Sequence, residues 1–119
     1  MNIESILGFK RIYKALSFSF AGFKAAWDNE QAFRQEVGVL LLAIFLVATM
    51  SVTPIEQLLL LGSIILVILV EILNSAIEAI VDRIGPEMHE LSGRAKDLGS
   101  AAVMLTIALA IMTWLVILF

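Results

Sequence analysis

The chain has 119 residues, of which 61% are hydrophobic, and its mean hydropathy of +0.98 is too high for an ordinary water-soluble domain. No P-loop and no GxGxxG motif occurs, which excludes a soluble-type nucleotide-binding fold. The composition therefore predicts a single integral membrane domain over residues 1–119, and we expect no nucleic-acid partner. The net charge of −3 says little about the orientation of the chain, because membrane topology follows the basic residues.

The N-terminal segment, about residues 5–29, has an amphipathic pattern. Apolar and aromatic residues recur every three or four positions, from Phe9 and Tyr13 to Phe20 and Trp27, while basic residues occupy the other faces. A helix of this kind lies in the membrane interface with its apolar face towards the lipid. We therefore expect an interfacial helix whose aromatic stripe serves as a membrane anchor.

Three transmembrane helices are predicted after it, over about residues 33–52, 56–82 and 95–119. Between Glu36 and Glu56 lie 19 uncharged residues, and residues 101–119 form an uncharged run of equal length. Each run is close to the roughly 20 residues that cross a bilayer. Glu71 interrupts the middle stretch, but an apolar face continues beyond it. The predicted fold class is an all-α membrane protein, with one amphipathic interfacial helix and three transmembrane helices.

The basic residues predict how these helices are oriented. All eight Lys and Arg residues lie either before residue 37 or between residues 83 and 96. The positive-inside rule then places the N-terminus and the loop around residues 82–98 in the cytoplasm, and the C-terminus on the outside. Residues 1–10 contain no long apolar core, so we expect no cleavable signal peptide.

Three polar residues share one face of the middle transmembrane helix. Asn74 lies three residues after Glu71, and Glu78 lies seven residues after it, so all three point roughly one way. A charge at mid-bilayer costs about 2.5 to 3.5 kcal/mol on an insertion scale. A purely structural glutamate is the alternative, but it rarely comes with Asn and Glu on the same stripe. The pattern therefore predicts a site that binds a metal ion or moves a proton.

The predicted topology brings other polar residues to the same cytoplasmic boundary. Mg²⁺ takes oxygen ligands and keeps several waters, so Glu30 and Glu78 together with substrate phosphates could hold it. Glu71 lies deeper, in a less polar setting that suits a proton acceptor. Lys96 could neutralise a phosphoryl group, and a helix N-terminus expected near residues 96–100 would offer free backbone N–H groups. The alternative is that Glu30 and Lys96 are solvated or topology-setting charges.

Other features have structural interpretations. His89 is the only histidine; it is expected in a loop, exposed and without a partner. Ala102, Thr106 and Ala110 form a ridge of small residues, which suits close helix packing in a membrane.

Three blocks of sequence closely resemble the bacterial integral-membrane diacylglycerol kinase family: AAWDNEQAFRQE (25–36), VEILNSAIEAIVDRIG (70–85) and HELSGRAKDLGSAAV (89–103). The resemblance covers about residues 8–119. It implies a small homotrimeric enzyme of the bacterial inner membrane, unrelated to soluble kinases. Such an enzyme transfers the γ-phosphate of MgATP to the hydroxyl of diacylglycerol at the cytoplasmic face, and gives phosphatidate and ADP.

The resemblance also implies roles for individual residues, matched position by position. Glu71 would be the general base, Asn74 and Lys96 further catalytic residues, and Glu30 and Glu78 the metal-binding carboxylates. The implied nucleotide-binding residues are Arg11, Phe18, Glu30, Glu78, Glu87, His89, Lys96 and Asp97, and the implied lipid-binding residues are Arg11, Ala15, Ser19, Ser100 and Trp114. The chain departs from the best-known members at Phe18, Phe20 and Met88, where those members carry aromatic residues with a hydroxyl or an indole.

Two other functions compete with this interpretation. An undecaprenol kinase of the same fold would phosphorylate a polyprenyl alcohol, although HELSGRAKDLGSAAV favours the diacylglycerol branch. A small proton- or cation-conducting protein would also carry intramembrane carboxylates, but it leaves Glu30 and Lys96 without a role.

Overall fold

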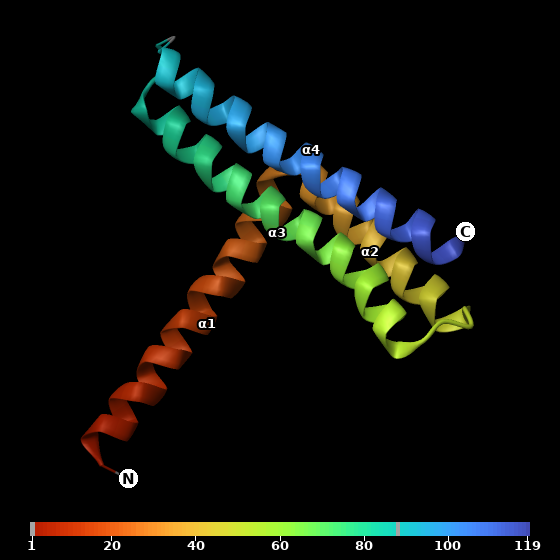
Figure 1. The fold of residues 1–119 in the computed structure, drawn as a ribbon. Helices are drawn as coiled ribbons and strands as arrows, with labels where there is room; N and C mark the ends of the chain where they lie inside the picture. Colours follow the sequence, from red (N-terminus) through yellow and green to blue (C-terminus); the bar gives the residue numbers. More distant parts are fainter. Residues whose placement is uncertain (1, 88) are drawn as a thin grey trace.

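The computed structural model describes residues 2–87 and 89–119, and every regular element in that part of the chain is an α-helix (Figure 1). The helices are α1 (Ile3–Asn29), α2 (Gln31–Thr49), α3 (Pro54–Ile84) and α4 (Glu90–Leu118). Helices α2, α3 and α4 are each long and apolar enough to cross a membrane. The predicted all-α class is therefore confirmed, and the chain is a multi-pass membrane protein.

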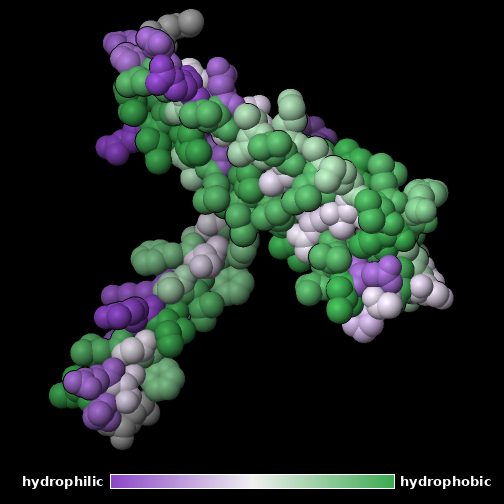
Figure 2. Space-filling view, viewed as in Figure 1, coloured by the Kyte–Doolittle hydropathy of each residue, from purple (hydrophilic) through white to green (hydrophobic). Residues whose placement is uncertain are grey.

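Helix α3 is the centre of a three-helix bundle, with α2 and α4 packed against it. Its buried apolar residues include Leu60, Ile64 and Val67, and Ala43 and Val47 are buried on α2. The outward faces of the bundle carry large exposed apolar side chains. Figure 2 shows this apolar surface over the bundle, with hydrophilic residues gathered at the α3–α4 end and along α1. The distribution suits a bundle surrounded by lipid.

Helix α4 packs on α3 through a stripe of mostly small residues. The less exposed residues of α4 recur every three or four positions, so they form one face of the helix. They include Ser92, Ala95, Gly99, Val103, Thr106 and Ala110. The expected ridge was wrong at Ala102, which is exposed; Gly99 and Val103 continue the stripe instead.

Helix α1 leaves the bundle at an elbow formed by a single residue (Figure 1). Glu30 stands between α1 and α2 in an extended conformation, with φ −118° and ψ 107°. Its backbone N–H donates to the Ala26 carbonyl at 2.9 Å, and its own carbonyl accepts from the Arg34 N–H at 3.3 Å. The Arg34 guanidinium also donates to the Trp27 carbonyl across the bend. The end of α1 and the start of α2 therefore both fix the position of Glu30.

Helix α4 begins at Glu90, earlier than the expected start near residue 95. The prediction of free backbone N–H groups near residues 96–100 was wrong, because these residues lie inside the helix, where each N–H bonds to a carbonyl one turn back. His89 is exposed, as expected, but it is the N-cap: its Nδ1 accepts from the Leu91 N–H at 3.0 Å. The polar GRAKD block is therefore helical.

Candidate active site

Four carboxylates gather where the elbow meets α3. Glu71 is buried on α3 with 8% of its surface exposed. The carboxylates of Glu30 and Glu78 are close enough to act on the charge of Glu71, and Glu71 in turn acts on the charge of Glu36 on α2. One oxygen of Glu36, Oε2, is buried without a hydrogen-bond partner among the described residues. In the sequence, Glu36 only marks the limit of an uncharged run, and no role was predicted for it.

Asn74 connects the cluster to α4. It is 9% exposed, and its Nδ2 donates to Glu78 Oε1 at 3.3 Å. Its Oδ1 is buried, has no hydrogen-bond partner in the described part of the chain, and lies against the backbone of α4 at Gly99. At Asn74, the polar stripe predicted on α3 is therefore buried against α4.

Lys96 brings a positive charge to the edge of the cluster. Its Nζ lies 2.8 Å from Asp82 Oδ1, in an ion pair that joins α4 to α3, and it is within electrostatic reach of Glu78. Asp82 was not among the predicted site residues. The helical period could have identified it, because Asp82 lies one turn beyond Glu78 on the same stripe of α3.

A hollow of about 490 Å³ lies beside this ion pair, between the last turn of α3, the α3–α4 loop and the first turns of α4. Its polar lining includes Asp82 and Lys96 together with Glu87, His89 and Glu90. Three residues predicted to bind nucleotide, Glu87, His89 and Lys96, therefore lie around one space.

The chain has close relatives among characterised families. Residues 17–118 match the family described as prokaryotic diacylglycerol kinase. The chain belongs to this family. A diacylglycerol kinase of Escherichia coli (strain K12) is 56% identical over 112 residues, which cover 94% of this chain and 92% of that protein. Diacylglycerol kinases of Haemophilus influenzae and Pseudomonas aeruginosa are each 44% identical, over 94% and 93% of this chain and 95% and 90% of theirs.

Membership in the prokaryotic diacylglycerol kinase family confirms the resemblance carried by the three sequence blocks and the expected enzyme class. A kinase uses ATP as its co-substrate, so the hollow beside Lys96 is a candidate nucleotide site. The conducting-protein interpretation finds no support in the family match.

The substrate-binding residues that the resemblance implies on α1 do not lie near the carboxylates of the same chain. Arg11, Ala15, Phe18 and Ser19 are exposed on α1, and Figure 1 shows that helix leading away from the bundle. At 1.5 Å per residue, Arg11 lies about 28 Å along the helix from Glu30. On α4, Asp97 and Ser100 are exposed, Asp97 next to Lys96 and Ser100 one turn further into the helix. Met88 lies outside the described residues.

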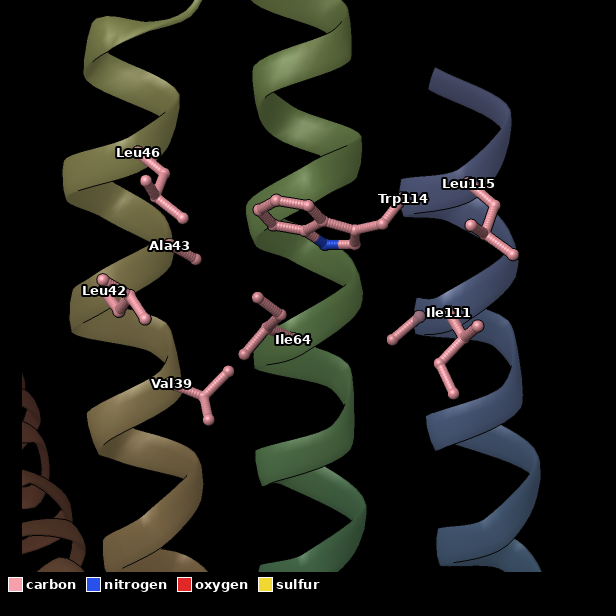
Figure 3. A pocket seen from close by; sticks show the side chains of 9 residues that line it. Val39, Leu42, Ala43, Leu46, Ile64, Ile111, Trp114 and Leu115 are labelled. Atoms are coloured by element: carbon pink, nitrogen blue, oxygen red, sulfur yellow. The ribbon is translucent and has the colours of Figure 1, made fainter. Parts of the chain in front are cut away.

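Trp114 lies far from the carboxylates of this kinase, in an apolar groove of about 380 Å³ (Figure 3). It lies 18 positions after Lys96 on α4, or about 27 Å at 1.5 Å per residue. Its indole Nε1 donates to the Leu60 carbonyl of α3 at 3.0 Å. The other residues that line the groove are apolar: Val39, Leu42, Ala43, Leu46, Ile64, Ala110, Ile111 and Leu115. Any lipid that contacts Trp114 therefore meets an apolar groove.

The carboxylates fit the kind of Mg²⁺ site that a kinase uses. Over residues 2–87 and 89–119, no group of three or more His, Cys, Asp or Glu side chains is arranged to hold a metal ion alone. Mg²⁺ usually takes only one or two carboxylates, and waters and substrate phosphates complete its shell. Glu30 and Glu78, which both act on the charge of Glu71, supply that number of ligands.

Proposed function

We propose that this chain is an MgATP-dependent lipid kinase of the bacterial inner membrane, which phosphorylates the hydroxyl of diacylglycerol and gives phosphatidate for phospholipid metabolism. The observation that carries the proposal is the meeting of a buried carboxylate, Glu71, with Glu30, Glu78 and the Lys96 cation at one end of the bundle. The relatives named diacylglycerol kinase support the choice of acceptor.

In this proposal Glu71 is the general base. No hydrogen bond or ion pair among the described residues holds its carboxyl, which leaves it available for a substrate hydroxyl. The lipid oxygen forms a bond to the γ-phosphorus, the bond from that phosphorus to the ADP oxygen breaks, and the hydroxyl proton passes to Glu71. Phosphoryl transfer depends mainly on positioning and charge neutralisation, so one direct in-line step suffices.

The neighbouring residues position and neutralise the phosphates. Glu30 and Glu78 would hold Mg²⁺ together with ATP oxygens, and bound Mg²⁺ supplies charge neutralisation at the phosphates. Asn74 orients Glu78 through its amide hydrogen bond. Lys96, held by Asp82, presents its ammonium to the transferring group.

We also propose a homotrimer, with the N-terminus and the active site in the cytoplasm as the basic residues predict. Arg11, Ala15 and Ser19 stand on a helix that leads away from its own bundle, so only a second copy can bring them to a carboxylate cluster. The chain contains no cysteine, so introduced thiols can test this. When the variants Ala15→Cys and Asn29→Cys are mixed, cross-links between α1 of one copy and the elbow of another are expected; products containing only one chain would contradict the arrangement.

Purified protein in mixed micelles with ATP and Mg²⁺ tests the substrate, with diacylglycerol and undecaprenol offered in separate reactions. Faster conversion of diacylglycerol is the expected result. A preference for undecaprenol would keep the site and the mechanism but replace the acceptor. No product from either lipid would refute the kinase proposal for this chain.

The substitution Glu71→Gln tests the general base. It keeps the shape of the side chain and removes its basic oxygen, so turnover should be lost while the oligomer still assembles. Glu56→Gln is a matched control on the same helix: Glu56 accepts from the Thr53 N–H in a capping box, and glutamine can do the same. A near-normal rate for Glu71→Gln would remove Glu71 from the mechanism.

A further inference from the structure

Gly99 occupies a position at which no other residue fits the observed packing. Of the described residues of α4, it is the one that is buried. A Cβ built on Gly99 would overlap Asn74 Oδ1 and would lie 3.1 Å from Asn74 Cγ. The Asn74 amide therefore occupies the space that any side chain at position 99 would need.

The other glycines of the helices do not share this constraint. A Cβ at Gly8, Gly22, Gly38, Gly62 or Gly93 would meet nothing within 4 Å. Glycine is unfavourable inside a helix, because it has more conformational freedom to lose than alanine. Close approach to Asn74 gives a physical reason for glycine at position 99.

The contact has a consequence for Glu78. Only the amide nitrogen of Asn74 can donate to a carboxylate, so the bond to Glu78 Oε1 requires Nδ2 on that side and Oδ1 towards α4. The Asn74 amide is planar, and it is confined between the backbone of α4 at Gly99 and the Glu78 carboxylate. Any shift of the amide away from α4 alters its bond to Glu78.

We propose that Gly99 is a positioning residue for the phosphoryl-transfer site: its missing side chain lets the Asn74 amide lie against α4 and orient the Glu78 carboxylate. Gly99 itself touches no reacting group. The inference rests on the proposed function, in which Asn74 belongs to the catalytic set and Glu78 is a metal ligand. A Cβ at position 99 forces the amide to rotate or α4 to move, and a displacement of about 1 Å near the chemistry can lower a rate about 100-fold.

The first test compares Gly99→Ala with Gly38→Ala and Gly62→Ala, two glycines whose added Cβ meets nothing within 4 Å. For Gly99→Ala we expect kcat to fall about 10- to 100-fold and the Mg²⁺ concentration for half-maximal rate to rise. The two controls should retain both values. A change in the Mg²⁺ requirement separates positioning from a general loss of folded enzyme. Gly99→Ala that matches the controls in both values would overturn the inference.

The second test measures detergent-induced unfolding of Gly99→Ala, Asn74→Ala and the double variant. Gly99→Ala should lower the unfolding midpoint when Asn74 is present and should have no such effect when Asn74→Ala has removed the clash. The double variant should assemble even if Gly99→Ala alone does not. If Gly99→Ala lowers the unfolding midpoint equally in the presence of Asn74 and in the Asn74→Ala variant, the inference is overturned. Failure of the proposed function would look different, because Glu71→Gln and Glu78→Gln would then keep normal turnover. The coupling of the unfolding midpoints between positions 74 and 99 would persist in that case, and it would still support the close packing of Gly99 against Asn74.

Discussion

The indole of Trp114 connects two transmembrane helices, and its replacement by Phe gives a sharp prediction. The substitution keeps an aromatic ring in the groove between α2 and α4 shown in Figure 3, and it removes the N–H that donates to the Leu60 carbonyl. That carbonyl also accepts from Ser63 Oγ at 2.9 Å. Leu60 is therefore not left with an unsatisfied carbonyl, and the loss should be limited to one hydrogen bond and part of the ring.

The size of the effect follows from that geometry. A hydrogen bond between membrane helices contributes about 0.6 kcal/mol on average and at most about 1.7 kcal/mol. We expect Trp114→Phe to lower the free energy of unfolding by about 0.5 to 1.5 kcal/mol. Trp114→Ala also removes the packing around the groove and should lower it by about 3 to 5 kcal/mol.

Detergent-induced unfolding in mixed micelles, followed by circular dichroism, measures both variants. Trp27→Phe is the matched control, because Trp27 stands on α1 with 49% of its surface exposed, and its ring makes no hydrogen bond in the described part of the chain. It should change the unfolding free energy by less than about 0.5 kcal/mol. If Trp114→Phe behaves like this control, the hydrogen bond to Leu60 contributes nothing; if it behaves like Trp114→Ala, the reasoning about the satisfied carbonyl is wrong.

Three further predictions follow from the site. Glu30→Gln and Glu78→Gln should each raise the Mg²⁺ concentration that gives half-maximal activity, because one charged ligand becomes neutral; an unchanged metal dependence in both would remove them from the metal site. Asp82→Asn removes the carboxylate that lies 2.8 Å from Lys96 and orients it, so the KM for ATP should rise. Because the ion pair is exposed, the free energy of unfolding should fall by less than about 1 kcal/mol. An unchanged or lower KM would contradict the orienting role of Asp82. Gly85 adopts φ +146°, a conformation that residues with a side chain rarely adopt. Gly85→Ala should therefore lower the free energy of unfolding by about 1 to 3 kcal/mol through backbone strain, and an unchanged unfolding midpoint would refute this.

The polar stripe of α3 could be predicted from the sequence because the helical period is a local property. Residues three and seven positions apart share a face whatever surrounds the helix, so Glu71, Asn74 and Glu78 were placed together correctly. The same period would have added Asp82. The three apolar helices were also predictable, because their length and hydropathy depend on composition alone.

The start of α4 was not predicted, because its first turns are polar. HELSGRAKD has the composition of a solvated loop, yet His89 caps the helix and Gly93 donates its N–H to the His89 carbonyl at 3.0 Å. Because α4 starts early, residues 96–100 lie inside the helix and have no free N–H groups, and Lys96 pairs with Asp82 on α3. Polarity describes exposure to water; it does not decide between a loop and an exposed helical turn.

The sequence by itself determined the number of helices, their apolar character and the polar face of α3, since each depends on residues within a few turns of one another. Only the tertiary structure decided which residues from different helices meet. The elbow brings Glu30 to Glu71, the register of α3 and α4 pairs Asp82 with Lys96, and the close approach at Gly99 confines Asn74. These contacts depend on how side chains of different helices fit in three dimensions, and a one-dimensional period carries no information about that fit.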